Sequence, residues 1–170
     1  MWKICRKSLI ALLFLTMNKV VLITGGARGI GSAIALELAK HGYDIVINYL
    51  TSKQPAKELK EKIESQYHVH CLTICADVSD VDQVNIMVSE VEEKMGGVDI
   101  LINNAAVDLS NLFHLKNAEE FKRTFDVNVV GAFNCSKRVY KHMLDQEYGR
   151  IINISSTNGI NTYYPMCIDY

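Results

Sequence analysis

The sequence predicts an α/β fold, in which helices cover both faces of a parallel sheet, and two observations lead to this prediction. Five short apolar runs recur along the 170 residues, and such runs suit strands that are buried on both faces of a parallel sheet. Segments with helical spacing of apolar residues separate these runs. The first run, Val20 to Ile23, leads through a glycine-rich turn to Ile30, Ile34 and Leu38, which recur at helical spacing.

The turn after this first run, from Thr24 to Gly31, reads TGGARGIG. Glycines let the backbone approach a ligand closely and adopt positive φ. The start of the following helix presents unpaired N–H groups and a positive dipole end to an anion. An ordinary strand-to-helix turn that happens to hold four glycines is the alternative. The position of the turn between a strand and a helix favours a phosphate site.

The glycine spacing of this turn resembles the cofactor loop of the short-chain dehydrogenase/reductase family. The resemblance implies a Rossmann-type doubly wound sheet and a nicotinamide cofactor. It also implies that the loop contacts the cofactor through Thr24, Gly25, Ala27, Arg28, Gly29, Ile30 and Gly31.

The second strand is predicted from Asp44 to Tyr49, and its end should meet the adenosine ribose. An acidic residue there would bind both ribose hydroxyls and repel a 2′-phosphate. No acid occurs from 45 to 54, which favours NADP(H) over NAD(H). The region instead offers donors and positive charge in Asn48, Thr51, Ser52, Lys53 and, from the glycine loop, Arg28. Solvated surface charge is the alternative for the two basic residues.

A surface helix from Pro55 to Gln66 and a third strand from His70 to Cys75 come next, followed by Asp77 and Val78. In the family that the chain resembles, such a pair contacts the adenine, and the carboxylate accepts a hydrogen bond from its exocyclic amine. A turn that caps the following helix, through Ser79 or Asp80, is the alternative or an additional role. The apolar stripe predicted for that helix consists of Val81, Val84, Val88, Val91 and Met95.

The fourth strand is predicted from Val98 to Ile102, and the sequence NNAA follows it at 103–106. This tetrapeptide is similar to the family's NNAG, with Ala106 in place of the glycine. We expect the asparagine side chains to tie adjacent strand ends together. The resemblance assigns Asn104 and Ala105 to the cofactor site, where a small residue leaves room for the ribose and nicotinamide.

A long helical segment from Ala118 to Gln146, capped by Asn117, is predicted next, with Phe121, Phe125 and Val129 on its core face. Asn128 lies inside it between apolar neighbours, where asparagine is a poor helix former. In the resembling family an asparagine at this place holds a water that links the active-site lysine to solvent. A hydrogen bond across a helix interface is the alternative.

The fifth strand is predicted within GRIINISS, and the predicted strand order is 3-2-1-4-5, with the fifth strand at an exposed edge. The family's catalytic serine and tyrosine correspond to Ser156 and Tyr170. Ser156 would bind the carbonyl oxygen of the substrate and Tyr170 would protonate it, while NADPH delivers hydride. The family's lysine would follow four residues after Tyr170. We therefore expect a sheet that is incomplete at its C-terminal edge, and a chain that is inactive alone.

Composition excludes several other classes. A net charge of −1 gives no reason to expect nucleic acid or an anionic membrane as a partner. The five scattered cysteines show neither a disulfide framework nor zinc-ligand spacing, so no metal site is expected and buried reduced thiols are favoured.

Residues 1–16 are basic and then apolar, and are expected to be an extension upstream of a domain spanning 17–170. A membrane anchor is the second interpretation and a cleaved signal the third. The reduced cysteines and the favoured interpretation of residues 1–16 together predict a cytoplasmic location.

The overall pattern resembles the 3-oxoacyl-acyl-carrier-protein reductases within the family. That resemblance implies a small or carrier-bound acyl substrate and a homo-oligomeric full-length form. An alcohol or sugar dehydrogenase shares the same motifs and stays an alternative. A Rossmann module that binds a nucleotide without catalysis is an alternative from another class, and a membrane-tethered interaction protein is a third.

Overall fold

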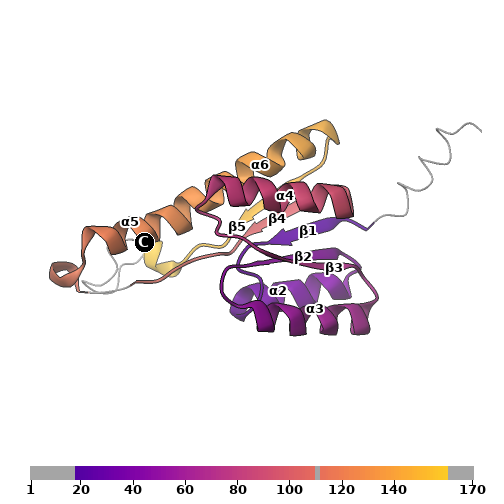
Figure 1. Ribbon diagram of the computed structural model, residues 1–170, viewed down its shortest axis with the longest axis horizontal. Helices are drawn as coiled ribbons and strands as arrows, with labels where there is room; N and C mark the ends of the chain where they lie inside the picture. The colour runs from indigo at the N-terminus through magenta and orange to yellow at the C-terminus, as the bar shows by residue number, and fades with distance from the viewer. Residues whose placement is uncertain (1–17, 110–111, 161–170) are drawn as a thin grey trace, which may run out of the picture.

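The computed structural model describes residues 18–109 and 112–160, which form a parallel sheet between two layers of helices (Figure 1). The strand order is β3-β2-β1-β4-β5, and every neighbouring pair is parallel. The predicted fold class and strand order are therefore confirmed. The strands are β1 (Val20–Ile23), β2 (Asp44–Tyr49), β3 (Cys71–Cys75), β4 (Ile100–Asn103) and β5 (Arg150–Asn153).

Helices α2 (Gly29–Lys40) and α3 (Lys53–Tyr67) cover one face of the sheet, and α4 (Val81–Met95) and α6 (Ala132–Asp145) cover the other (Figure 1). A continuous helical path leads into α6 from α5 (Ala118–Phe125) through a π-helical segment, η2 (Asp126–Gly131). Short 3-10 turns lie at η1 (Phe113–Leu115) and η3 (Thr157–Gly159). The chain leaves β3 and returns beside β1, so the strand order reverses between β1 and β4, which is where ligands bind in sheets of this kind.

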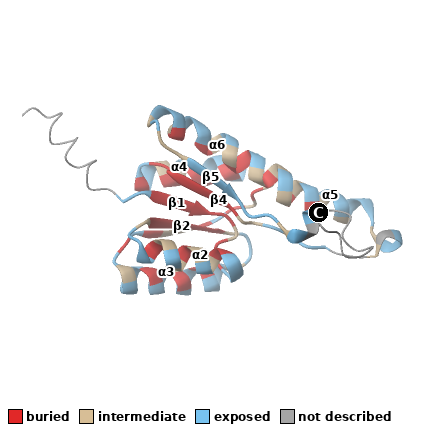
Figure 2. Cartoon of the chain, turned by 180° about the vertical axis from the view of Figure 1, so that it is seen from behind, coloured by how far each residue is buried: buried red, intermediate tan, exposed pale blue. Residues whose placement is uncertain are grey.

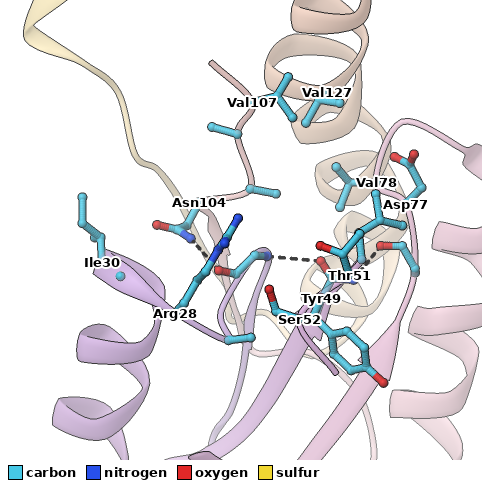
Figure 3. A pocket seen from close by; sticks show the side chains of 18 of the residues that line it. Arg28, Ile30, Tyr49, Thr51, Ser52, Asp77, Val78, Asn104, Val107 and Val127 are labelled. Atoms are coloured by element: carbon cyan, nitrogen blue, oxygen red, sulfur yellow. Dashed lines mark hydrogen bonds between the residues drawn. The ribbon is translucent and has the colours of Figure 1, made fainter. Parts of the chain in front are cut away.

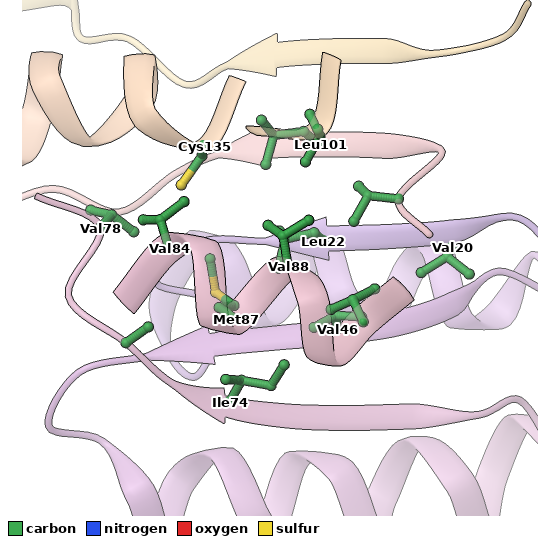
Figure 4. Close-up of a cluster of buried hydrophobic side chains, with 14 of the residues drawn as sticks. Val20, Leu22, Val46, Ile74, Val78, Val84, Met87, Val88, Leu101 and Cys135 are labelled. Atoms are coloured by element: carbon green, nitrogen blue, oxygen red, sulfur yellow. The ribbon is translucent and has the colours of Figure 1, made fainter. Parts of the chain in front are cut away.

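Alternation along β1 divides the core into two apolar clusters. Val20 and Leu22 pack into the cluster beneath α4 and α6, together with Val46 and Leu101 (Figure 4). Val21 and Ile23 pack into the cluster beneath α2 and α3. Every residue of β1 is buried, as the apolar run predicts for a central parallel strand.

The ends of the helices follow local chemistry. The Asp80 side chain accepts hydrogen bonds from the N–H groups of Asp82 and Gln83 and so caps α4. Asn117 and Glu120 form a reciprocal capping box at the start of α5. Both N-caps agree with the predictions.

The predicted core face of the long helix is wrong. Phe121, Phe125 and Val129 are all exposed, because α5 and η2 run beyond the end of the sheet and have no strand beneath them (Figures 1 and 2). The residues of this helical path that are buried are Thr124, Val127, Gly131, Asn134, Cys135, Val139 and Met143.

Two further sequence-based expectations need correction. Val81, predicted in the apolar stripe of its helix, is 54% exposed, because it lies in the first turn of α4, outside the layer that covers the sheet. The residues of α2 that are buried are the small Gly31, Ala35 and Ala39. Arg138, which the pattern predicts to be solvated, instead forms two hydrogen bonds with Glu92 at 2.8 and 2.7 Å.

Strand β5 forms one edge of the sheet, and all four of its residues are exposed (Figure 2). Ile151 and Ile152 are exposed, whereas their partners on the neighbouring strand β4, Leu101 and Ile102, are buried. The predicted exposed edge is therefore confirmed.

The described cysteines divide into two kinds. Cys71 and Cys135 are buried, and burial raises the pKa of each thiol to about 12. Cys75 is exposed, contrary to the prediction of a buried thiol, because it ends β3 on the sheet's other edge, and its thiol donates to the Leu50 carbonyl.

Residues 18–109 and 112–160 contain neither a membrane-spanning helix nor a metal-ligand cluster. No helix there has the length and apolar character that crossing a bilayer needs. No group of three or more His, Cys, Asp or Glu side chains is arranged there to hold a metal ion. The expected extension at 1–16 and the predicted catalytic Tyr170 lie outside the described residues.

Candidate cofactor site

A hollow of about 380 Å³ lies at the carboxyl edge of the sheet, where the strand order reverses (Figure 3). Most of the predicted cofactor residues line it together: Gly25, Ala27, Arg28, Gly29, Ile30, Asn48, Asp77, Val78, Asn104 and Ala105. The predicted donors Thr51 and Ser52 line it as well, whereas Lys53 does not. Thr24 and Gly31 lie behind the lining and are buried.

The glycine loop shows why these positions need glycine. Gly25 has φ +60°, and a Cβ there would lie 2.9 Å from the Ala105 Cα. Gly31 is closely packed, since a Cβ would lie 2.7 Å from the Asn104 amide nitrogen. Gly29 has φ +57° and open space around it. Gly25 and Gly31 therefore allow the loop to pack closely against Ala105 and Asn104, and Gly29 leaves room for a ligand.

The start of α2 faces this hollow. Its N-cap residue is Arg28, whose side chain makes no capping hydrogen bond. The first N–H groups of a helix need an acceptor from outside the helix, and an anion is a suitable one. The loop and helix start therefore fit a phosphate group.

Thr24 and Asn104 join the ends of β1 and β4. The Thr24 hydroxyl accepts from the backbone N–H groups of Asn104 and Ala105 at 2.9 and 3.0 Å. The Asn104 amide donates in return to the carbonyls of Thr24 and Gly25, at 2.9 and 3.2 Å. Asn103 similarly donates to Asn153 of β5 at 2.8 Å. The prediction that asparagines tie adjacent strand ends is confirmed.

Asn48 lines the hollow but points its polar atoms into the protein. Its Oδ1 accepts from the Gly25 N–H at 3.2 Å, and its Nδ2 donates to the Ala76 carbonyl at 2.9 Å. The residue is only 2% exposed. The amide thus supports the glycine loop, and the polar groups that face the hollow at the end of β2 belong to Thr51 and Ser52.

Asp77 and Asp80 have separate roles after β3. Asp80 caps α4, which leaves the Asp77 side chain for other partners. Asp77 Oδ1 accepts from the N–H and hydroxyl of Ser79, at 2.9 and 2.6 Å, and Oδ2 accepts from Arg123 Nη2 at 2.9 Å. Partial burial by itself would raise the pKa of the Asp77 carboxyl, but the Ser79 and Arg123 contacts outweigh it and hold that pKa below its usual value.

The sequence reasoning missed Arg123 and Val107, which both line the hollow. Arg123 reaches the site from α5, 46 residues after the carboxylate that it contacts. No local pattern distinguishes it from the solvated basic residues on the same helix. Its role depends on how α5 lies against the turn after β3.

Asn128 lies in the π-helical segment η2 and holds the chain after β4. Its Oδ1 accepts from the Val107 N–H at 2.9 Å, and its Nδ2 donates to the Val107 carbonyl at 3.0 Å. The predicted alternative, a hydrogen bond across a helix interface, is not found, because the partner is loop backbone. The role that the family resemblance implies for Asn128 stays a prediction. Single π-helical turns are frequent at functional sites, and this one helps to form the hollow through Val127.

Ser156 follows β5 at the same carboxyl edge of the sheet but is not part of the hollow's lining. It is partly buried, and its carbonyl accepts from the Gly159 N–H at 3.2 Å. The structure therefore brings most of the predicted nucleotide-binding residues together around the hollow, and Ser156 lies outside its lining.

Comparison with known proteins gives a consistent family pattern. The family profile described as short chain dehydrogenase matches residues 19–170. The 3-oxoacyl-(acyl-carrier-protein) reductase FabG of Staphylococcus aureus is 41% identical over 143 residues, which are 84% of this chain and 58% of that protein. An acetoacetyl-CoA reductase of Paracoccus denitrificans is 37% identical over the same share of this chain and 57% of its own length.

A solved structure shows the same architecture. The crystal structure of NAD⁺-bound xylitol dehydrogenase superposes with a TM-score of 0.83 at 29% identity, over 91% of this chain and 59% of that one. The chain thus spans less than three-fifths of the length of the curated relatives described above.

Proposed function

The chain belongs to the short-chain dehydrogenase family, and from that premise we propose that it forms the cofactor-binding part of an NADPH-dependent carbonyl reductase. The observation that carries this proposal is the hollow at the switch point of the sheet. Gly29, which has open space around it, lines this hollow at the start of α2, and no side chain caps the first N–H groups of that helix. This arrangement fits the pyrophosphate of a dinucleotide.

Preference for NADP(H) follows in this proposal from the charges around the hollow. Arg28 lines it, and so do Thr51 and Ser52, which follow β2 and offer hydroxyl groups (Figure 3). Asp77 is the only acidic residue among the lining residues of the described chain, and Arg123 balances its charge. A 2′-phosphate would therefore meet donors and positive charge.

The proposed chemistry divides between the cofactor and the chain. When bound, the cofactor supplies hydride to a carbonyl carbon. Ser156 donates a hydrogen bond to the carbonyl oxygen as it gains negative charge, and Tyr170 gives that oxygen a proton. Asn128 positions the Val107 backbone beside the cofactor. The roles of Ser156 and Tyr170 rest on the family resemblance, and that of Asn128 rests on its two hydrogen bonds.

The proposed substrate is a 3-oxoacyl thioester, small or bound to a carrier protein. The names of the two curated relatives support this choice, since both are reductases of 3-oxoacyl groups. The xylitol dehydrogenase structure supports a second candidate, an NAD-linked alcohol or sugar dehydrogenase. A cytoplasmic homo-oligomer is part of the first proposal.

Titration of the chain with NADPH and NADH, followed by calorimetry, tests the cofactor proposal. We expect NADPH to bind more tightly, and Arg28→Met to weaken NADPH binding about tenfold or more while NADH binding changes little, because a charge-assisted contact contributes about 1.5–3 kcal/mol. Lys53→Met is the matched control, since Lys53 is outside the lining of the hollow. Tighter binding of NADH, or equal losses in both variants, would contradict the proposal.

A further inference from the structure

Three side chains close a hydrogen-bonded ring beside Val78 at one side of the hollow. Arg123 Nη2 donates to Asp77 Oδ2 at 2.9 Å, and Arg123 Nη1 donates to the Ser79 hydroxyl at 2.8 Å. The Ser79 hydroxyl in turn donates to Asp77 Oδ1 at 2.6 Å. Both terminal nitrogens of the guanidinium are engaged, and the carboxylate is held at Oδ2 by Arg123 and at Oδ1 by Ser79.

The contacts leave the Asp77 carboxylate with one free acceptor position. An ionised carboxylate offers about four lone pairs to donors. Two donors from Ser79 occupy Oδ1, and Arg123 occupies one position on Oδ2. The side chain is 20% exposed and lines the hollow, so the remaining position on Oδ2 is accessible to a ligand there.

The backbone of this turn is also held in place. The Asn134 amide donates to the carbonyls of Val78 and Ser79, at 3.1 and 3.4 Å. Gly131 packs so closely that a Cβ there would lie 2.6 Å from Val78 Cγ2. With the backbone fixed from α6 and η2, Arg123 is the group that sets the position of Asp77 Oδ2.

We propose that Arg123 makes this site selective for a purine with an amino group at position 6 over one with a carbonyl there. Asp77, kept as a charged acceptor with one vacant position, attracts an N–H donor and repels a carbonyl oxygen. Arg123 is a positioning residue, because it acts through Asp77. This inference rests on the proposed function, since it takes a dinucleotide as the ligand and its adenine as the group near Asp77.

The test compares NADPH with its hypoxanthine analogue, in which the 6-amino group is replaced by a carbonyl. Calorimetry on the full chain gives the ratio of the two dissociation constants, and NADH with its own hypoxanthine analogue gives a second ratio that does not depend on the 2′-phosphate. A hydrogen bond to a charged group corresponds to about a tenfold preference or more for the adenine forms.

Arg123→Met should reduce this preference to within about threefold, and Asp77→Asn should do the same because an amide can both donate and accept. Arg138→Met is the matched control. Arg138 of α6 likewise makes a bidentate contact, with Glu92 of α4, but it is not among the residues that line the hollow. It should leave the preference unchanged.

The outcomes separate this inference from the proposed function. Failure of the wild-type chain to bind any of the four dinucleotides overturns both. Binding without a preference for adenine overturns this inference alone. Equal weakening of both members of a pair in Arg123→Met, with the preference retained, also overturns it, because Arg123 would then be a structural residue only. If Arg123→Met does not fold, Arg123→Lys, which keeps the charge but cannot contact Ser79 and Asp77 through two nitrogens, decides between the same outcomes.

Discussion

The Asn48 side chain accepts a hydrogen bond from the Gly25 N–H, and this contact joins the end of β2 to the first turn of the glycine loop. The same amide donates to the Ala76 carbonyl after β3. One buried side chain therefore connects three segments that meet at the carboxyl edge of the sheet.

Replacing Asn48 by alanine should destabilise the fold and weaken nucleotide binding together. The variant leaves the buried Ala76 carbonyl and the part-buried Gly25 N–H without these partners, and an unsatisfied buried group costs about 1–3 kcal/mol. Urea denaturation should show a loss of roughly 2 kcal/mol or more. Thr51→Ala, at an exposed position, should change stability by less than about 0.5 kcal/mol. Similar stability of the two variants would disprove the bracing role of Asn48.

Gly131→Ala should lower stability although the position is helical. Alanine gains about 1 kcal/mol over glycine in helix propensity, whereas overpacking costs about 1–3 kcal/mol. The new Cβ would lie 2.6 Å from Val78 Cγ2, so we expect the overpacking to dominate. Thermal unfolding gives the measurement, with Gly159→Ala, which has open space around it, as the control. A Gly131→Ala variant that melts above the wild type would contradict this packing argument.

Acid should remove stability through two carboxylates that arginines hold. The Arg138 hydrogen bonds keep the pKa of the Glu92 carboxyl below its usual value, and Asp77 behaves likewise despite the opposing effect of its burial. A carboxyl pKa that is lowered in the folded state contributes stability that is present above the unfolded pKa, near 4. That contribution is lost as the pH falls through the lowered folded value.

Melting temperatures measured between about pH 6 and pH 2.5 test this linkage, because the unfolded carboxyls titrate near pH 4. The wild-type curve should fall more steeply in acid than the curves of Arg123→Met and Arg138→Met. Parallel curves for the three proteins would show that neither pair contributes to the acid dependence.

Thiol reactivity should distinguish Cys75 from the buried cysteines. The thiolate is the reacting form, and burial raises the pKa of Cys71 and Cys135 to about 12. Iodoacetamide at pH 8, with the modified sites mapped by mass spectrometry, should label Cys75 before Cys71 and Cys135, which should react only after denaturation. Early labelling of Cys135 in the native chain would contradict the packing beneath α4 and α6.

Local patterns predicted the elements because their causes are local. Val20 to Ile23 is a buried run that only a central strand accommodates, and the glycines after it fix the turn. The faces of the long helix could not be predicted, because an apolar residue such as Phe125 is buried only where a strand lies beneath it. The helical spacing is the same whether or not the sheet extends that far.

The candidate site shows the same division between local and distant causes. The sequence places Asp77 after a strand, but the guanidinium that orients it lies on a helix 46 residues later. Asn48 was predicted to offer donors to the cofactor, and its amide instead bonds to backbone groups of two other segments. Partners of this kind depend on how elements pack, which the sequence around either residue does not encode.

The position of α5 beyond the sheet has a consequence for its local opening. With Phe121 and Phe125 facing solvent, little apolar area opposes unfolding of this helix, and polar contacts such as that of Arg123 hold it to the rest of the molecule. Amide hydrogens of α5 should therefore exchange with deuterium through fluctuations of lower free energy than those of α6, whose Cys135 and Val139 are fully buried. A ligand that bonds to Asp77 should slow that exchange, and the exchange of α5 amides would then report occupancy of the hollow.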